Sequence, residues 1–408
     1  MKIVIVVQNY PPEEGPVSYS RDVACALSAL GHDVVVITGL PHYPTGKLYK
    51  GFESFKVYKT IENDITVFRI PLMLASNSQP IKRIFGFITF IFTSLPFCLY
   101  TKKPDVFIIS VPPFSTVAIG IITKLFRRKP VIMMLRDFEP VYSLKIRRSK
   151  ENKIFTKIAY LLSKLYRLSD ALIITHTGQL SHIKNAGLDD LKVKVIPHTI
   201  NLKEFDKLSL LQTNNYFDKE SDILYAVYVG TMGKVHALSL LVKNLVCDEI
   251  SSMPIEFNFF GYGEERDRCI EIVKTSGKTN VRFFESVPSE LVPSILKTAD
   301  ILILSSIAPD NLGLKIYSYL SSGKPILFHG WGVAKNFLQS INAGWSVELD
   351  DKEMLIKVLK EIFDSKNKLS AIGPNGRRYA EENFSFDDFG KKWNAIVNEV
   401  INSKKKIN

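Results

Sequence analysis

The sequence predicts an α/β protein with two doubly wound domains, one after the other along the chain. Short apolar runs alternate with helical patterns over most of the 408 residues, and the alternation restarts after a polar stretch near the middle. A chain of this length is too long for one hydrophobic core and suits two domains of ordinary size. Its composition, 46% hydrophobic and 23% charged, is typical of a globular protein.

The first domain begins with a buried strand. KIVIVVQ (2–8) is a continuous apolar run, and a loop and a helical pattern that ends at Gly31 follow it. The later strand candidates are DVVVIT (33–38), DVFIIS (105–110), VIMMLR (131–136), ALIIT (171–175) and VKVIP (193–197). Apolar strands separated by helices indicate a parallel sheet that is covered on both faces.

The second domain repeats this pattern. ILYAVYVG (223–230) is a strand candidate, and a loop and the helical run ALSLLVKNLV (237–246) follow it. The later strand candidates are IEFNFFG (255–261), VRFFES (281–286), DILILSS (300–306) and PILFHG (325–330). We expect the polar stretch at 197–224 to contain the linker between the domains.

Charge and cysteine content limit the partners and the compartment. The net charge of +12 favours anionic partners, and much of it lies in clusters at 82–83, 102–103, 127–129, 145–153 and 404–406. Without zinc-finger spacing or an aromatic RNA-binding signature, we expect a membrane surface as partner and no nucleic acid; a basic surface that only confers solubility is the alternative.

The four cysteines lie far apart, which indicates a reducing compartment. The first residues lack a cleavage site, so they are predicted to be a strand and not a signal peptide.

One segment departs from the alternating pattern. Residues 84–100 contain no charged side chain and have basic pairs on both sides. The segment includes Pro96 and is at the short limit for a membrane span. Three interpretations compete: a helix lying in the membrane interface, a core helix and a true span. The basic flanks suit anionic headgroups and favour the interface.

Glycines follow three of the predicted strands. Gly15 follows the first, the run Gly230-Thr231-Met232-Gly233-Lys234 follows the strand at 223–230, and Gly263 follows the strand at 255–261. In a doubly wound sheet, ligands bind at the carboxyl ends of the strands, where glycine lets the backbone approach a phosphate and a helix N-terminus attracts an anion. We therefore expect diphosphate-binding loops with Lys234 as a cation. Ordinary strand-to-helix turns are the alternative.

Two further loops suit carbohydrate chemistry. The loop at 38–52 is rich in Pro, Gly and Tyr, and it either displays aromatic rings to a sugar or is inert. The segment after the strand at 300–306 places an acid, Asp310, and a cation, Lys315, near a helix start. Such groups suit sugar hydroxyls and phosphate, respectively. A solvated helix end is the alternative.

The motifs also occur in a recognisable order. The most specific is Pro-x-Tyr-Pro-Thr-Gly (41–46); the others include Tyr-Pro-Pro-Glu (10–13), Arg136-Asp137, Gly261-x-Gly263-Glu264 and Lys315-Ile316-Tyr317 before Gly323-Lys324-Pro325. In this order they resemble the retaining GT-B glycosyltransferases of family four. The resemblance covers nearly the whole chain and is greatest to the bacterial surface-polysaccharide branch, the fucosamine-transferase and colanic-acid-like enzymes.

The resemblance implies an architecture and a reaction. Two Rossmann-like domains would face each other across a cleft: 1–198 would bind the acceptor and 199–384 the nucleotide-sugar, while 385–408 would form a helix crossing back to the first domain. The enzyme would transfer a sugar, with UDP-sugar as the expected donor, to a carbohydrate or undecaprenyl-linked glycan with retention of configuration, in capsule, O-antigen or exopolysaccharide synthesis. We expect it in the cytoplasm, peripherally bound to the inner face of the cell membrane.

The resemblance also implies site residues. Catalytic roles fall to Asp310, Asp137 and Lys315. The donor-binding residues would be Gly15, Gly230, Thr231, Gly233, Lys234, Gly263, Asp310, Lys315, Ile316, Tyr317 and Ser318. The sequence contains no Asp-x-Asp, so we expect no metal and no cofactor, with Lys234 and Lys315 neutralising the departing diphosphate.

Some positions depart from the family pattern. Asp310 and Ser318 stand where the family has two glutamates, His198-Thr199-Ile200-Asn201 replaces Asn-Gly-Val-Asp, and Glu139 replaces a common tryptophan. These departures leave open a catalytically silent subunit that binds a partner transferase or a glycan. A nucleotide-sugar epimerase of the same fold is a third possibility.

Overall fold

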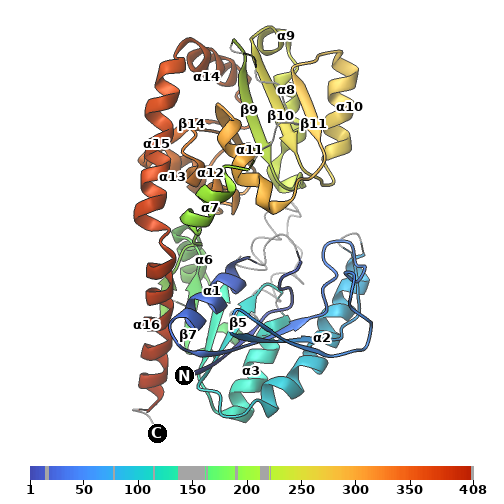
Figure 1. Cartoon of the computed structure of the whole chain (residues 1–408), viewed down its shortest axis with the longest axis vertical. Helices are drawn as coiled ribbons and strands as arrows, with labels where there is room; N and C mark the ends of the chain where they lie inside the picture. Colours follow the sequence, from blue (N-terminus) through green and yellow to red (C-terminus); the bar gives the residue numbers. More distant parts are fainter. Residues whose placement is uncertain are drawn as a thin grey trace. The chain divides into compact units, whose positions relative to one another are not determined.

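The computed structural model of the chain is shown in Figure 1. It describes residues 1–13, 18–76, 79–113, 115–136, 161, 164–188, 192–211, 220 and 222–405. The chain divides into two compact units. The N-terminal unit comprises Met1–Thr199 and Phe386–Asn408, and the C-terminal unit comprises Ile200–Ser385. The sequence placed each division one residue earlier.

The N-terminal unit is built on an eight-stranded sheet with the order β3-β4-β2-β1-β5-β6-β7-β8, in which only β3 is antiparallel to its neighbour. Its elements are β1 (Lys2–Val6), α1 (Ser18–Ala29), β2 (Asp33–Gly39), β3 (Tyr58–Glu62), β4 (Ile65–Ile70), α2 (Pro80–Tyr100), β5 (Val106–Val111), α3 (Ser115–Arg127), β6 (Val131–Leu135), β7 (Ala171–Ile174), a 3₁₀ turn η1 (Thr177–Gln179), α6 (Leu180–Asn185), β8 (Val193–Val195) and α16 (Phe386–Lys405). The predicted parallel strands are all present.

The strands are apolar throughout because helices cover both faces of this sheet. Ile3 and Ile5 of β1 belong to the core on the side of α1 and α16, and Val4 and Val6 belong to the core on the side of α2 and α3. The strand order reverses between β1 and β5. Ligands of doubly wound sheets bind outside the carboxyl ends of the strands at such a point.

The hairpin β3–β4 was not anticipated from the sequence. Asn63 and Asp64 form its turn, both with left-handed backbone (φ 49° and 61°). Asn and Asp tolerate this conformation better than most residues, so the pair was the available signal for a two-residue hairpin. The hairpin places β3 at the edge of the sheet.

Helix α16 packs against α1 in the N-terminal unit (Figure 1). Trp393 of α16 is fully buried, and its ring lies 6.3 Å from that of Tyr19 on α1. The Tyr19 hydroxyl donates to the carbonyl of Ile196 at 2.6 Å. The last helix of the chain is therefore part of the core of the first unit.

Helix α2 has two different faces. Phe90, Ser94 and Cys98 are fully buried against the unit. The opposite face exposes a stripe of apolar side chains: Ile81 (70% exposed), Ile84, Phe85, Ile88, Phe92 (71%) and Tyr100 (84%). By length and composition alone, α2 is the one helix in the described part of the chain that could cross a membrane. The interpretation as a core helix explains the buried face of α2 but not the apolar side chains on its exposed face.

The C-terminal unit has a parallel six-stranded sheet with the order β11-β10-β9-β12-β13-β14. Its elements are α7 (Leu202–Leu208), β9 (Leu224–Val229), a 3₁₀ turn η2 (Lys234–His236), α8 (Leu238–Leu245), α9 (Asp248–Ser251), β10 (Ile255–Phe260), α10 (Arg266–Ser276), β11 (Val281–Phe284), a 3₁₀ turn η3 (Ser289–Leu291), α11 (Val292–Thr298), β12 (Ile301–Ser306), α12 (Lys315–Ser322), β13 (Ile326–Gly330), α13 (Val333–Ser340), β14 (Gly344–Val347), α14 (Lys352–Asp364) and α15 (Lys366–Asn383). Here the strand order reverses between β9 and β12.

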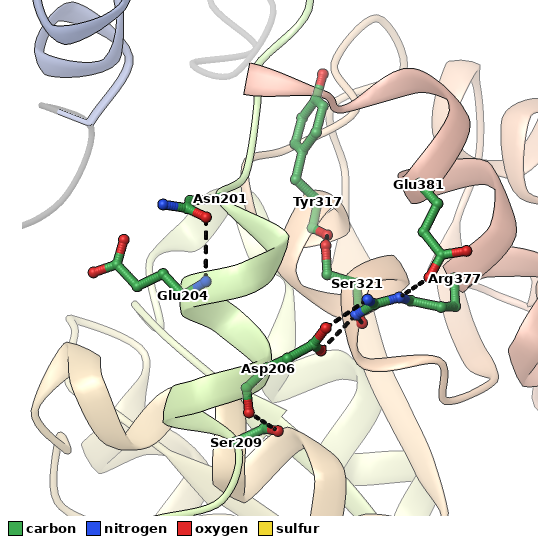
Figure 2. A network of polar contacts seen from close by, with 8 residues as sticks. All are labelled: Asn201, Glu204, Asp206, Ser209, Tyr317, Ser321, Arg377 and Glu381. Atoms are coloured by element: carbon green, nitrogen blue, oxygen red, sulfur yellow. Dashed lines mark hydrogen bonds and ion pairs between the residues drawn. The ribbon is translucent and has the colours of Figure 1, made fainter. Parts of the chain in front are cut away.

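The stretch expected to hold the linker contains helix α7. Asn201 caps this helix by accepting from the Glu204 backbone N–H at 3.2 Å. Figure 2 shows Asp206 of α7 facing Arg377 of α15, and the guanidinium binds both carboxylate oxygens at 2.7 Å. Arg377 also donates to the carbonyl of Ser321 at the end of α12. This pair attaches the start of the C-terminal unit to its own core.

Candidate functional site

The loops after β9 and β10 pack backbone against backbone at the carboxyl end of the C-terminal sheet. The Met232 N–H donates to the Tyr262 carbonyl at 2.7 Å, so the two loops are hydrogen-bonded. A Cβ on Gly261 would lie 2.0 Å from the carbonyl oxygen of Gly230, and one on Gly263 would lie 2.5 Å from Met232 backbone atoms. Only glycine fits at both positions, which explains two of the glycines that the sequence singled out.

Two more loops join this surface. The Ile307 N–H after β12 donates to Val235 in the β9 loop at 2.8 Å. The Pro309 carbonyl accepts from the Val333 N–H at 2.7 Å, and a Cβ on Gly332 would lie 2.0 Å from the same carbonyl oxygen. Four strand ends therefore form one continuous surface at the point where the strand order reverses.

Lys315 lies beneath the β9 loop at the start of α12. Its Nζ is 2.5 Å from the Tyr228 hydroxyl, 3.2 Å from the Thr231 carbonyl oxygen and 3.2 Å from His236 Nε2. It also lies 4.4 Å from the centre of the Tyr228 ring. An ammonium group has three N–H donors, so these three acceptors can engage all of them. A Cβ on Gly230 would lie 2.3 Å from Lys315 Cε, so glycine at 230 leaves room for the lysine.

Burial changes the proton affinity of this cluster. Desolvation lowers the pKa of Lys315 to about 7. Burial, and then the charge of Lys315, lower the pKa of His236 to about 3. His236 is therefore neutral near pH 7. Its Nδ1 lies 3.2 Å from the Ser305 carbonyl, which can only accept, so Nε2 is left as the acceptor for Lys315.

His236 and Tyr228 were missed by the sequence analysis. Tyr228 is fully buried within β9, and in the sequence it is indistinguishable from the other apolar residues of that strand. His236 lies in η2, two residues after Lys234. A histidine close to a glycine-rich strand end was the available signal, but the sequence does not show that Lys315 lies against it.

Lys234 occupies a different environment from Lys315. Its side chain is 70% exposed, and its Nζ is 3.4 Å from Glu264 in the β10 loop. An exposed pair of this kind is weak and readily exchanges partners. Thr231 is exposed as well, and no atom lies within 4 Å of the position of a Cβ on Gly233. Lys234 is thus a solvent-facing cation at the edge of the same surface.

The loop before α12 holds Asp310, partly buried, and α12 begins at Lys315. The Ser318 hydroxyl donates to the Lys315 carbonyl at 2.9 Å. Ile316 (1% exposed) and Tyr317 (5%) belong to the hydrophobic core, and the Tyr317 ring packs 4.8 Å from that of Phe384. Their side chains lie on the inner face of α12, so the predicted role of these two residues in donor binding would rest on their backbone N–H groups in the first turn of the helix.

The N-terminal unit has a pocket of about 180 Å³ where its own strand order reverses. Its polar lining residues come from the carboxyl ends of β1, β2 and β6 and from the first turn of α2: Gln8, Asn9, His42, Tyr43, Arg83 and Arg136. Gln8 is 5% exposed, and its Oε1 has no hydrogen-bond partner in the described structure. Buried polar atoms are usually paired, so this amide oxygen is available to a water molecule or a ligand in the pocket.

Glu13 organises one wall of this pocket. Its Oε1 accepts from the backbone N–H groups of His42 and Tyr43, each at 2.8 Å, and its Oε2 accepts from the Tyr10 N–H at 3.1 Å. Burial raises the pKa of Glu13, and these hydrogen bonds oppose the shift. The carboxylate joins the loop after β1 to the aromatic loop after β2. Part of the 38–52 loop, His42 and Tyr43, thus lines a pocket.

Two of the predicted site residues, Gly15 and Asp137, lie outside the described residues. So do Glu139 and the basic cluster at 145–153. Within the described ranges, no group of three or more His, Cys, Asp or Glu side chains is arranged to hold a metal ion. The positive charges of the candidate sites come from lysine and arginine.

Two family descriptions match the chain, one in each unit. Residues 14–199 match the glycosyl transferase 4-like domain. Residues 214–379 match the glycosyl transferases group 1. The first match includes the pocket residues from His42 to Arg136 but begins after Gln8 and Asn9, and the second includes the strand-end surface of the C-terminal unit.

Two relatives resemble the chain in sequence. The colanic acid biosynthesis glycosyl transferase WcaI of Escherichia coli (strain K12) is 25% identical over 312 residues, which are 74% of this chain and 75% of that protein. The α-monoglucosyldiacylglycerol synthase of Acholeplasma laidlawii is 25% identical over 423 aligned positions and covers 100% of both chains.

Solved structures share the fold. Sucrose-phosphate synthase from Thermosynechococcus elongatus has a TM-score of 0.77 at 14% identity over 98% of this chain and 99% of its own. HepE of Anabaena in complex with UDP has a TM-score of 0.70 at 14% identity over 98% and 100%. WaaG, a glycosyltransferase involved in lipopolysaccharide biosynthesis, has a TM-score of 0.69 at 14% identity over 97% and 99%. At this identity the likeness concerns the fold alone.

Proposed function

Because the chain belongs to the group 1 glycosyl transferases with the GT-B fold, we propose that it transfers a sugar from a nucleotide-diphosphate-sugar to a lipid-linked glycan. The expected donor is a UDP-sugar, and the expected outcome is retention of anomeric configuration. The process would be surface-polysaccharide synthesis, on the cytoplasmic face of the cell membrane. Similarity to WcaI, named for colanic acid biosynthesis, supports this process.

The observation that carries the proposal is Lys315 beneath the glycine loops of the C-terminal unit. Glycosyl transfer releases a nucleoside diphosphate, and a preorganised cation stabilises the charge that develops on it. We assign the diphosphate to the surface formed by Gly230, Gly263 and Lys234. The anion would then replace one of the present acceptors of Lys315. In this assignment Asp310 holds hydroxyl groups of the donor sugar.

The pocket of the N-terminal unit is assigned to the acceptor. Gln8 and Asn9 supply amide groups for sugar hydroxyls, and Tyr43 supplies an aromatic ring. Arg83 and Arg136 supply positive charge suited to a phosphate that links a glycan to a lipid. Arg83 lies in the first turn of α2, the helix with the exposed apolar stripe. The lipid of the acceptor would therefore have an apolar surface close to the pocket.

The exposed stripe of α2 supports membrane association. Its exposed residues recur along one face from Ile81 to Tyr100 while the other face is packed, as in a helix that lies in the membrane interface. We propose peripheral binding through this face. The basic residues at 82–83 and 102–103 would add attraction to anionic headgroups.

A second candidate function is a binding subunit without transferase activity. The observation that favours it is Ser318, whose hydroxyl is engaged with the carbonyl of its own helix. A short hydroxyl held in this way contributes less to ribose binding than the glutamate of the family pattern.

One experiment distinguishes the two functions. The protein is incubated with UDP-, GDP- and ADP-sugars, with and without undecaprenyl-diphosphate-linked sugars, and released nucleoside diphosphate is measured. We expect acceptor-dependent release, a product with retained anomeric configuration by NMR, and at least a tenfold loss of turnover in Asp310→Asn at unchanged melting temperature. No release with any acceptor, together with glycan binding, would favour the binding subunit. Epimerisation of a donor without acceptor would instead indicate an epimerase.

A further inference from the structure

A second pocket lies in the N-terminal unit, remote from the strand ends of the candidate sites. It has a volume of about 590 Å³, within the range of ligand sites, and lies where the last turn of α2 meets the amino ends of β1 and β2. Phe68, Pro96, Phe97 and Tyr100 form an apolar floor, in which the Phe68 and Phe97 rings are 5.5 Å apart. None of its lining residues belongs to the pocket of Gln8 and Arg136.

Positive charge surrounds this floor. Three lysines and one aspartate line the pocket, and Lys2 is paired with that aspartate, Asp33, at 3.1 Å. Lys59 and Lys102 are exposed, and neither forms an ion pair with another described residue. Lys59 Nζ lies 5.8 Å from the centre of the Phe68 ring, so one cation is held directly over the apolar floor.

A nearby arginine neutralises the negative end of α2. The Arg127 guanidinium donates to the carbonyls of Leu99 and Thr101, at 2.7 and 2.8 Å. Carbonyls at a helix C-terminus carry partial negative charge and would otherwise repel an anion. The C-terminal end of α2 therefore repels an anion in the pocket only weakly.

The pocket also opens beside exposed apolar surface. Tyr100, in its wall, is 84% exposed and ends the stripe of α2. Leu125 and Phe126, in the last turn of the neighbouring α3, are 69% and 74% exposed. Exposed apolar side chains on neighbouring helices, together with basic residues, are typical of a membrane-contacting face. A ligand that joins an anionic head to an apolar tail would satisfy both features.

We propose that this pocket is a binding site for one anionic phospholipid, separate from the donor and acceptor sites. Lys59 and Lys102 hold the phosphate, and Phe68, Phe97 and Tyr100 hold the glycerol and the first carbons of an acyl chain. The inference rests on the proposed membrane association of α2. It adds a specific headgroup contact at the end of that helix, which fixes how the N-terminal unit is oriented on the leaflet.

The test uses a short-chain lipid that is monomeric in solution. Binding of dihexanoyl-phosphatidylglycerol below its micelle concentration is measured by calorimetry and compared with dihexanoyl-phosphatidylcholine. We expect one phosphatidylglycerol per chain and weaker binding of the neutral lipid. Lys59→Ala with Lys102→Ala should weaken binding about 25-fold, since each basic residue at an anionic headgroup is worth about fivefold. Both lysines are exposed, so the fold should be unaffected.

The controls separate this site from general charge and from the proposed function. Lys274→Ala with Lys297→Ala removes the same charge from exposed positions of the C-terminal unit and should leave binding unchanged. The proposed site is excluded if the wild type and the Lys59/Lys102 variant bind phosphatidylglycerol equally well. It is also excluded if phosphatidylcholine binds as tightly as phosphatidylglycerol. Glycerol 3-phosphate that binds as tightly as the lipid overturns the lipid as occupant. Because the lipid is free in solution, the result depends neither on glycosyl transfer nor on immersion of α2.

Discussion

Single residues at the strand ends of the C-terminal unit determine the chemistry of the candidate donor site. Lys315 is surrounded by three acceptors, and its desolvation by burial lowers its pKa to about 7. An incoming diphosphate favours the ammonium form again. Binding of an anion should therefore be coupled to the uptake of a proton.

The first prediction concerns this coupling. If the bound diphosphate raises the pKa of Lys315, affinity for UDP should be highest below pH 7. It should fall by up to about tenfold per pH unit as the pH rises above 7, because the free protein then loses a proton that the complex retains. Calorimetry in buffers of different ionisation enthalpy measures both the affinity and the proton uptake.

Two variants test whether Lys315 is the titrating group. Lys315→Met should bind UDP more weakly and lose the pH dependence. His236→Gln should retain the pH dependence, because His236, with its pKa about 3, does not titrate near pH 7. Proton uptake that persists in Lys315→Met would exclude this lysine as its source.

The second prediction compares two glycines of one motif. Gly230 has φ +132°, and an added Cβ would lie 2.3 Å from Lys315 Cε. Gly233 has φ −87°, and no atom lies within 4 Å of its Cβ position. Gly230→Ala should weaken UDP binding tenfold or more and lower stability by about 1–3 kcal/mol. Gly233→Ala should have little effect on either.

Measuring both variants side by side controls for general sensitivity of the loop. Calorimetry gives the UDP affinity, and chemical denaturation gives the free energy of unfolding. Equal effects of the two substitutions would contradict the packing of Lys315 beneath Gly230.

Among the elements, α2 is the one whose sequence pattern does not settle its environment. An apolar segment with basic flanks fits a core helix, an interfacial helix and a span. The structure has one packed face, at Phe90 and Cys98, and one exposed face, at Phe92 and its neighbours. One face of α2 is therefore covered by protein along its length, and only the opposite face is available to a membrane.

The third prediction therefore contrasts the two faces of α2. Phe92→Asp, at a position 71% exposed, should weaken binding to anionic vesicles tenfold or more at unchanged melting temperature, because an immersed Phe contributes about 1.5–3 kcal/mol. Phe90→Ala should lower the melting temperature, since a large-to-small change at this buried position costs about 3–5 kcal/mol. Sedimentation with vesicles and thermal melts measure these effects. Unchanged sedimentation of Phe92→Asp would exclude this face as the membrane contact.

For the whole molecule, the positions of the basic clusters indicate which unit is suited to contact a membrane, in addition to what the net charge indicates. The basic clusters at 82–83, 102–103, 127–129 and 404–406 all belong to the N-terminal unit, and so does the exposed stripe of α2. The candidate nucleotide surface belongs to the C-terminal unit. One unit thus carries the features suited to a membrane, and the other carries those suited to a soluble donor.

The fourth prediction concerns salt. Raising the ionic strength from 0.1 to 1 M shortens the Debye length from about 10 to about 3 Å, so the electrostatic share of vesicle binding should be lost. Because the apolar contacts of α2 are not screened, release from anionic vesicles should be partial. Binding to neutral vesicles should be weaker and nearly independent of salt. Equal binding to both vesicle types at low salt would contradict a role for the basic clusters.

The alternation of apolar strands and helices was sufficient to predict two doubly wound units, because a strand buried on both faces must be apolar along its whole length. The glycines at 230 and 263 were predictable for a related reason: a tight strand-to-helix connection at the carboxyl end of a parallel strand favours glycine. The resemblance of ordered motifs added the family. These inferences rest on local pattern, so they required no knowledge of how distant segments meet.

Long-range packing decided the rest. Tyr228 and His236 contact Lys315 across about 80 residues of sequence, and no local pattern encodes that contact. The motif also does not show that the side chains of Ile316 and Tyr317 pack on the core, on the inner face of α12. Lys59 and Lys102, which line the pocket proposed to bind a phospholipid, come from a hairpin that was not predicted and from the loop just after α2. Both line one pocket only when the sheet has formed, since contacts between distant segments depend on the register and crossover of its strands.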